Sequence, residues 1–390
     1  MLVDVHAHYP MQVIGDVVPD TLLKEARRAR NRPTLGDRVR AIVLRIASTF
    51  FSHRSPVRNY RVSVNGMRSS GVGVAMSVLT SPFEEAGLGR PFGSAPESQY
   101  FQALLKDMQA VEDEIATHPR DELRLVRNLA ELDDALDAKA TALVHALEGG
   151  FSLGEGVQEV TDNVATLKQR GVVYITLAHL LYRQVATNCS AFPFLNDKRY
   201  RKVFPQPEGV GLTDRGVAAL RAMVDNRVLL DIAHMRQDAL DVTWRLLDEE
   251  LDPHAEYPVL ATHVGYRFGE QEYMLTEATV LQIKRRNGLI GLILAQHQLN
   301  DGRREEETET FEDSLKVIFD HIDKLADILG GYEHLVIGTD FDGFIKPTMT
   351  GLDNMRDLAK LERRLEERYK DNAKLITSEN ALRVLRQLWS

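Results

Sequence analysis

The sequence predicts an α/β fold, a closed (β/α)8 TIM barrel of the metal-dependent hydrolase type with extra N-terminal and C-terminal helices. Two observations predict it: eight short apolar segments recur along the 390 residues, and longer segments with helical spacing lie between them. Nearly continuous apolar strands are typical of parallel sheets that are covered on both faces. A doubly wound open sheet is the alternative, because periodicity does not show whether a sheet closes.

The expected strands occupy residues 2–6, 72–79, 142–148, 172–177, 228–232, 258–262, 289–294 and 335–338. The expected helices include residues 99–117, 157–170, 214–225, 237–249, 276–286 and 311–329. The first of these helices has its apolar side chains, such as Leu104, Met108 and Val111, on one stripe, as in a helix that packs on a sheet. Residues 355–388 predict two closing helices.

Three segments are longer than the connections that a minimal barrel needs. Residues 20–60 predict one or two extra helices, residues 182–212 a long loop rich in aromatic residues, proline and asparagine, and residues 296–311 a loop with a solvated polar run. No Pro/Gly-rich linker divides the chain. We therefore expect a single domain over residues 1–390, a length common for α/β barrels.

Composition excludes several classes of protein. A formal net charge of −9 argues against a nucleic-acid-binding surface, and the cluster Arg27, Arg28 and Arg30 is interpreted as a solvated helix face. The single cysteine, Cys189, excludes an internal disulfide and fits a reducing compartment. No apolar run approaches the roughly 18 residues of a membrane span, and the N-terminus shows no signal-peptide pattern. We expect a cytoplasmic protein with no nucleic-acid or membrane partner.

Metal-ligand residue types lie at the C-terminal ends of the expected strands, where barrel enzymes carry their catalytic groups. His6 and His8 are two residues apart in an extended segment, so both imidazoles point to one side and can reach one ion. A carboxylate at a buried strand end, such as Glu148, is costly unless it is paired, and bridging two ions would stabilise it. The sequence predicts two divalent ions, zinc being the expected metal, held by His6, His8, Glu148, His234 and His263.

Two further strand-end residues are candidates for chemistry. Asp340 would stay ionised beside two cations and could accept a proton from bridging water. His179 follows the fourth strand. Asp342 is interpreted as a turn residue before Gly343, and His145, whose position has the opposite parity to Glu148, as a structural residue that faces the helices.

These residues lie in a series of motifs whose order and spacing resemble the membrane dipeptidase (renal dipeptidase) family of the amidohydrolase superfamily. The motifs are LEGG at 147–150, YITLAH at 174–179, GLT at 211–213, DIAH at 231–234, PVLATH at 258–263, GTDFDG at 338–343 and ENALRVL at 379–385. The resemblance runs from the first strand to the final helix. Known members cleave dipeptides, and some hydrolyse β-lactams.

The resemblance implies a role for each candidate. The first ion would take His6, His8 and Glu148, and the second would take Glu148, His234 and His263. His179 would contact the substrate and polarise the scissile carbonyl. Asp340 would be the acid/base.

The sequence departs from the family at three places. His8 stands where the family usually has aspartate, which changes the charge of the first site by one unit. The arginine that in the family clamps the substrate carboxylate aligns with Tyr273 or a neighbour. Either Arg267, or Arg183 in the long loop, replaces it, or the substrate has no such carboxylate. The asparagine–cysteine pair that usually follows the histidine at 179 is absent there.

We therefore expect an enzyme, a binuclear metal-dependent hydrolase that cleaves an amide bond in a dipeptide or N-acyl amino acid through a metal-bridging hydroxide. The alternatives are an amidohydrolase acting on a lactone, phosphoester or cyclic amide, and a non-catalytic barrel that binds a ligand. The absence of a lysine for a carbamylated bridge on the fourth strand favours the dipeptidase-like arrangement. The expected partner is a small-molecule or dipeptide substrate, and a homodimer is allowed.

Overall fold

The structure is a computed structural model that describes residues 1–14, 36, 39–40, 42–43, 60–86, 92–303, 308–343 and 347–390. The helices predicted within residues 20–60 lie almost entirely outside these ranges, as do Arg27, Arg28 and Arg30, so those expectations stay predictions.

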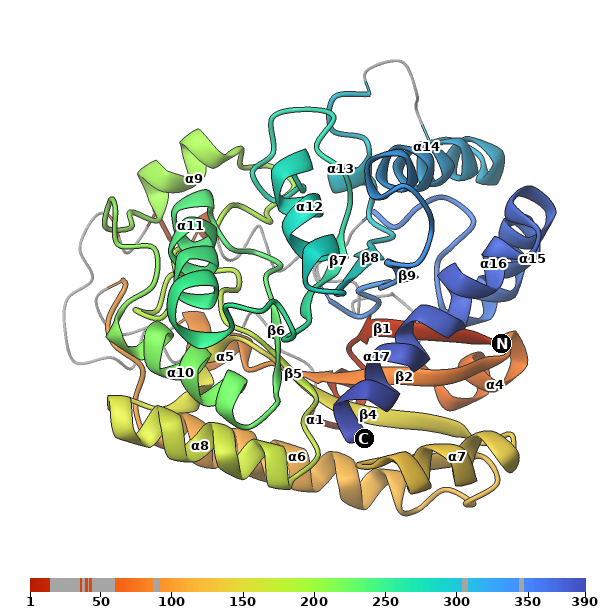
Figure 1. Cartoon of the computed structure of the whole chain (residues 1–390), viewed down its shortest axis with the longest axis horizontal. Helices are drawn as coiled ribbons and strands as arrows, with labels where there is room; N and C mark the ends of the chain where they lie inside the picture. The colour runs from red at the N-terminus through yellow and green to blue at the C-terminus, as the bar shows by residue number, and fades with distance from the viewer. Residues whose placement is uncertain are drawn as a thin grey trace.

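Eight parallel strands form a closed barrel, which confirms the predicted fold class (Figure 1). Neighbouring strands follow the order β2-β1-β9-β8-β7-β6-β5-β4, and β2 also pairs with β4 from residues 74–79 to 142–147. That last pairing joins the two edges of the sheet and excludes the open doubly wound alternative. The barrel strands are β1 (Leu2–Ala7), β2 (Val72–Leu79), β4 (Thr141–Glu148), β5 (Tyr174–Thr176), β6 (Leu229–Asp231), β7 (Val259–Val264), β8 (Leu289–Leu292) and β9 (Leu335–Ile337).

A ninth strand, β3 (Leu123–Leu125), pairs with the start of β4 and was not predicted. Its three residues include the charged Arg124 and lie among other charged residues, so they lack the apolar run that revealed the equally short β5, β6 and β9.

Helices connect the strands and cover the barrel, with bounds close to the predicted ones (Figure 1). The longer helices are α4 (Val64–Ser70), α6 (Gln99–Ile115), α7 (Leu129–Asp137), α8 (Val157–Gln169), α9 (Asp197–Val203), α10 (Asp214–Asp225), α11 (Gln237–Leu246), α12 (Glu277–Arg285), α14 (Phe311–Leu329), α15 (Leu358–Tyr369) and α17 (Asn380–Trp389). Short helices are α1 (Met11–Ile14), α5 (Pro82–Ala86), α13 (Gln296–Leu299) and α16 (Asn372–Lys374). Two π-helical turns, Leu247–Leu251 and Leu375–Glu379, extend α11 and join α16 to α17.

Local sequence signals explain why some bounds were predictable. Helix α14 begins after Thr310, whose hydroxyl accepts from the Asp313 N–H while the Asp313 carboxylate accepts from the Thr310 N–H. It ends at Gly330, which has a φ of 74°, a left-handed conformation that favours glycine. The predicted range, residues 311–329, is therefore confirmed.

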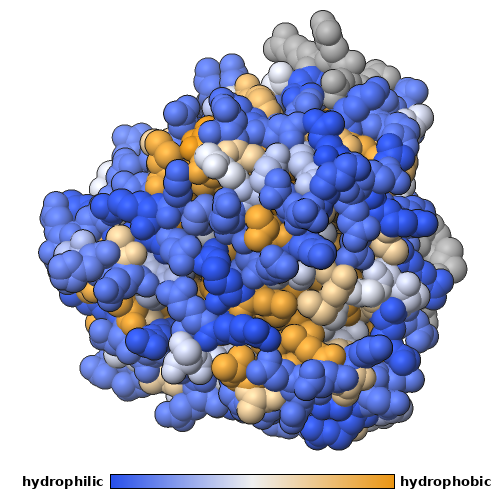
Figure 2. Space-filling model, turned by 45° about the vertical axis from the view of Figure 1, so that its right-hand side comes forward, coloured by the Kyte–Doolittle hydropathy of each residue, from blue (hydrophilic) through white to orange (hydrophobic). Residues whose placement is uncertain are grey.

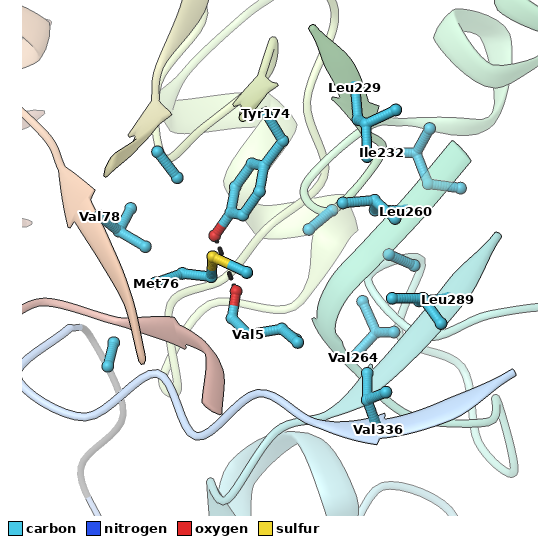
Figure 3. Close-up of a cluster of buried hydrophobic side chains, with 14 of the residues drawn as sticks. Val5, Met76, Val78, Tyr174, Leu229, Ile232, Leu260, Val264, Leu289 and Val336 are labelled. Carbon is cyan, nitrogen blue, oxygen red and sulfur yellow. Dashed lines mark hydrogen bonds between the residues drawn. The ribbon is translucent and has the colours of Figure 1, made fainter. Parts of the chain in front are cut away.

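The interior of the barrel is apolar below the strand ends. Figure 3 shows part of this cluster, including Val5, Met76 and Leu260, and the Tyr174 hydroxyl that donates to the Val5 carbonyl. At the N-terminal end of the strands, Val384 and Leu385 of α17 line the same apolar pocket. The C-terminal helix therefore closes the end of the barrel that carries no candidate ligand.

The outer face drawn in Figure 2 is mostly hydrophilic, and its hydrophobic side chains form small groups rather than a continuous band. Among the described residues, none of the helices has the length and apolar character needed to cross a bilayer.

The long loop over residues 182–212 is packed rather than open. Asn188 donates to the Leu180 carbonyl and to the Tyr200 hydroxyl, and all three residues are buried. The Cys189 N–H donates to the His234 carbonyl, so the loop is tied to the end of β6. This loop forms part of the cover over the C-terminal ends of the strands.

The polar run of the loop over residues 296–311 is only partly described. Asp301 accepts from the Gln271 N–H, and Arg303 pairs with Asp320, so these two side chains bind neighbouring segments. Residues 304–307 lie outside the described part of the chain.

One buried histidine of the fold makes stability depend on pH. His321 of α14 accepts from the Tyr266 N–H through Nδ1 and donates to the Leu299 carbonyl through Nε2, and burial lowers its pKa to about 4. In the unfolded chain a histidine titrates near pH 6.5. Below that pH the histidine is protonated in the unfolded chain but stays neutral in the folded protein. Its contribution to the free energy of unfolding is therefore complete above pH 6.5 and falls by roughly 3 kcal/mol as the pH drops to about 4.

We expect His321→Gln to weaken this dependence, because a glutamine amide offers one donor and one acceptor but does not titrate. Thermal unfolding of the metal-free wild type and of the variant should be compared from pH 7.5 to pH 4.5. As the pH falls, the melting temperature of the wild type should decrease more than that of the variant. If the melting temperatures of both proteins depend on pH in the same way, His321 does not carry the effect.

Candidate metal centre and active site

The buried carboxylate of Glu148 is surrounded by imidazoles at the C-terminal end of the barrel. Glu148 ends β4 and is 1% exposed. Five Nε2 atoms lie within 3.1–3.6 Å of its two oxygens, those of His6, His8, His179, His234 and His263. The structure therefore brings the five predicted ligands, together with His179, to one point.

These side chains come from the C-terminal ends of five strands or from the residues just after them, and β1 supplies both His6 and His8. His6 lies in β1, His263 in β7, and His234 three residues after β6. His234 and Asp340 have positive φ values of 65° and 57°, a sparsely populated conformation for residues other than glycine. The strain is local to the ends of β6 and β9 and turns both side chains toward the centre.

The residues fit two divalent ions. Among the described residues, His6, His8 and Glu148 form one group with ligand atoms within 4.8 Å of one another, and Glu148, His234 and His263 form another. The His6 Nε2 atom is buried and has no hydrogen-bond partner there. The Nε2 atoms of His234 and His263 face each other at 3.0 Å, although at least one must lack a proton. A cation that accepts lone pairs from these nitrogens and from a shared carboxylate satisfies all of them.

Electrostatics inside the cluster favour an ionised carboxylate. Burial alone raises the pKa of Glu148, but His179 and His6 outweigh it and hold that pKa well below its ordinary value. For Asp340, burial is likewise outweighed by the hydrogen bond from His8 and the nearby His263, and the pKa is lowered. Both carboxylates are therefore available as acceptors.

Asp340 lies beside the first group of ligands. Its Oδ1 atom is 3.1 Å from His8 Nε2 and 3.9 Å from His6 Nε2. The position allows the carboxylate to exchange a proton with a molecule held between the two groups. The neighbouring Asp342 is also buried, and its oxygens accept from the backbone N–H groups of Arg61 and Val62. It anchors a distant segment, which is more than the turn role predicted for it.

His179 is held between two carboxylates. Its Nδ1 atom lies 2.7 Å from Glu85 Oε2, and its Nε2 atom lies 3.1 Å from Glu148 Oε2. Glu85 Oε1 also accepts from the Leu181 N–H. Burial opposes protonation of His179, yet Glu148 and Glu85 together raise its pKa well above the ordinary value. Glu85 therefore fixes the ring so that Nε2 faces the centre.

Sequence reasoning missed Glu85. Glu85 lies in α5, six residues after the end of β2. The signal that could have indicated it is the one that found the other residues, a position shortly after the C-terminal end of a barrel strand. Nothing local distinguishes Glu85 from the adjacent Glu84. By contrast, His145 faces away from the centre, with Nε2 3.5 Å from Glu112 of α6, as its parity predicted.

The centre opens into a cleft that is also lined by Leu180, Ala191, Tyr273 and Gln298. The Tyr273 hydroxyl donates to the His263 carbonyl, and its ring packs edge-on against His234. Tyr273, the position aligned with the family's arginine, is therefore a cleft residue without a positive charge.

The two arginines considered for a substrate carboxylate do not line this cleft in the described part of the chain. Arg267, predicted to bind substrate, donates instead to the carbonyls of Met274 and Glu272. Arg183 is buried and donates to the Tyr100 hydroxyl. Their guanidinium groups hold loops together, and the structure places Arg267 outside the residues that line the cleft, so its predicted role in substrate binding stays a prediction.

Curated sequences contain distant relatives. An uncharacterized protein from the pqqA 5′ region of Klebsiella pneumoniae is 27% identical over 295 residues, covering 73% of this chain and 96% of the relative. An uncharacterized dipeptidase of Schizosaccharomyces pombe is 27% identical over 241 residues, covering 60% of this chain and 50% of the relative.

Solved structures share the fold. The dipeptidase AC, a family M19 metallopeptidase, superimposes with a TM-score of 0.66 at 18% identity and covers 100% of this chain and 98% of its own. A metallopeptidase from Rhodobacter sphaeroides, solved with a phosphinate mimic of the dipeptide L-Ala-D-Ala, gives a TM-score of 0.67 at 18% identity over 100% of this chain and 99% of its own.

The family model described as membrane dipeptidase, peptidase family M19, matches residues 23–389, nearly the whole chain. This match agrees with the resemblance seen in the motifs and with the barrel. The chain therefore belongs to the membrane dipeptidase family of metal-dependent peptide hydrolases.

Proposed function

We propose that the chain hydrolyses the amide bond of a dipeptide or an N-acyl amino acid at a centre of two zinc ions. His6, His8 and Glu148 would hold the first ion, and Glu148, His234 and His263 the second. The observation that carries the proposal is the convergence of these four imidazole Nε2 atoms on one buried carboxylate.

Bound ions would polarise the scissile carbonyl and make water acidic enough to attack it near neutral pH. The remaining work falls to side chains of the protein. The cleft is lined by the ligand cluster, so a substrate that enters it would meet Glu148, His179 and Asp340 directly.

Asp340 would move the proton. Its carboxylate borders the first group of ligands, 3.1 Å from His8 Nε2 and 3.9 Å from His6 Nε2, and has no hydrogen bond from a main-chain N–H among those described. It can therefore accept a proton from the attacking water and deliver it to the leaving amine.

His179 would stabilise the developing oxyanion. Because Glu85 binds Nδ1, the ring presents Nε2 to the centre, and an N–H there can donate to the carbonyl oxygen as negative charge develops. A fixed donor of this kind costs no reorganisation during the reaction.

Dipeptides are the first substrates to test. The related Rhodobacter sphaeroides metallopeptidase was solved with a mimic of L-Ala-D-Ala, so a screen should pair L,L- and L,D-dipeptides with N-acyl amino acids. Metal-reconstituted wild type should turn over at least one of these classes.

The metal assignment predicts two transition-metal equivalents in purified wild type by elemental analysis. His234→Ala or His263→Ala should empty one site preferentially, whereas Glu148→Ala should weaken both because it removes the shared ligand. His118→Ala is the matched control, since His118 pairs with Glu114 at the end of α6, away from the centre. Full occupancy in all three centre variants would contradict the assignment.

The role of Asp340 predicts that Asp340→Asn keeps its fold and metal content but loses turnover on the order of 10²–10⁴-fold, as expected when a general acid/base is removed. Steady-state kcat on the best substrate from the screen measures this, with metal content as the control. Near-normal kcat would remove Asp340 from the mechanism.

The hydrogen bonds of Arg267 predict that this side chain does not read a substrate carboxylate. We expect Arg267→Ala to leave unchanged the ratio of kcat/KM between free-acid and C-terminally amidated dipeptides, and Arg183→Ala provides the parallel comparison. A ratio that collapses toward one in either variant would identify that arginine as the clamp after all.

A further inference from the structure

We propose that the hydroxyl of Thr262 is a shared positioning group of the metal centre, which orients one histidine of each ion's ligand set. It lies 2.9 Å from His6 Nδ1 and 2.8 Å from His263 Nδ1. His6 belongs to the first set and His263 to the second. The inference rests on the proposed metal centre and adds a residue that is not itself a ligand.

The direction of these hydrogen bonds follows from the proton count. Thr262 Oγ1 carries one proton and lies 2.7 Å from Asp231 Oδ2, which also accepts from the Thr176 hydroxyl at 2.6 Å. Asp231 Oδ1 accepts from the N–H groups of Thr262 and Ala233. Three other groups already donate to this carboxylate, and the Thr262 hydroxyl is the fourth donor, so its single proton points to Asp231.

The lone pairs of the Thr262 oxygen then face the two imidazoles. Both Nδ1 atoms must carry a proton to form these bonds, which leaves the Nε2 lone pairs turned toward Glu148. The Tyr174 hydroxyl supports this tautomer for His6: it donates to the Val5 carbonyl, so toward His6 Nδ1, 3.0 Å away, it also acts as an acceptor.

This arrangement explains a third group of possible ligands, His6, Asp231 and His263. Their ligand atoms meet around the Thr262 oxygen, so a hydroxyl rather than an ion fills that point. By contrast, the Nδ1 atoms of His8 and His234 have no hydrogen-bond partner in the described part of the chain. Thr262 therefore orients one histidine per ion, and the second histidine of each set lacks such a contact.

An irregularity in the backbone of β7 places the Thr262 hydroxyl between the two imidazoles. The register with β8 shifts between Ala261 and Val264, and the Thr262 carbonyl occupies space beside two glycines. A Cβ atom on Gly291 or Gly338 would lie 1.9 or 1.8 Å from that oxygen, far inside contact distance. The two glycines thus permit the irregularity that places Thr262 between the two ligand sets.

The test is zinc affinity, measured on apo protein by competition with a chromophoric chelator. Thr262→Val keeps the shape and removes the hydroxyl, and we expect both sites to lose roughly 10–100-fold in affinity, the usual effect of removing such a partner. Thr262→Ser should restore tight binding. Thr176→Val is the matched control: the Thr176 hydroxyl also donates to Asp231 Oδ2 but, unlike that of Thr262, has no hydrogen bond to a ligand histidine among those described, so this variant should bind zinc as wild type does.

A second measurement does not depend on whether the valine variant folds. Side-chain ¹⁵N spectra of zinc-loaded wild type should show protonated Nδ1 and metal-bound Nε2 for both His6 and His263, and the opposite tautomer in either ring overturns the inference. If wild type binds two ions and Thr262→Val binds them equally tightly, this inference fails while the proposed function stands. If wild type binds no zinc, both fail.

Discussion

The carboxylate of Glu148, removed from water at the end of a barrel strand, is the constraint on which the centre depends. Burying an ionised group without compensation costs several kcal/mol, and in a protein such groups are paired or bind metals. Five imidazole nitrogens are gathered around it, drawn from the C-terminal ends of four other strands, β1, β5, β6 and β7. The two divalent ions of the proposed centre would neutralise this charge, and metal binding would then be linked to the stability of this end of the barrel.

Closure of the barrel makes that gathering possible. Strands that are parallel and closed bring all their C-terminal ends to one face, so residues as far apart as His6 and Asp340 meet. The last residues before the centre leave regular geometry, with left-handed backbone at His234 and Asp340 and a register shift in β7. The regular part of the barrel thus stabilises irregular backbone at the strand ends, where it sets the direction of the side chains of the centre. Irregular backbone of this kind is common at functional sites.

The centre departs from the usual family pattern at His8, and the departure lies next to the proposed acid/base. A neutral imidazole in place of a carboxylate leaves one more positive charge in the first ligand set. Its Nε2 atom is also 3.1 Å from Asp340 Oδ1. The same substitution therefore acts on both the ion and the proton carrier. On the cleft side, Tyr273 stands at the aligned position of the clamp and points its hydroxyl at the His263 carbonyl. Membership in the family thus fixes the reaction class more firmly than the substrate.

The sequence by itself predicted the alternation of strands and helices, the bounds of helices such as α14, and the ligand-type residues at the strand ends, because periodicity, capping and strand-end position are local properties of the chain. It did not show whether the sheet closes, which the pairing of β2 with β4 decides, and it did not reveal β3, which contains Arg124 and lies among charged residues. Only the tertiary structure decided which side chains orient those ligands. Glu85 reaches His179 across 94 residues and Thr262 reaches His6 across 256, while Arg267 turns to nearby carbonyls instead of the cleft. Such contacts depend on where the closed barrel places each side chain, and no local pattern encodes that placement.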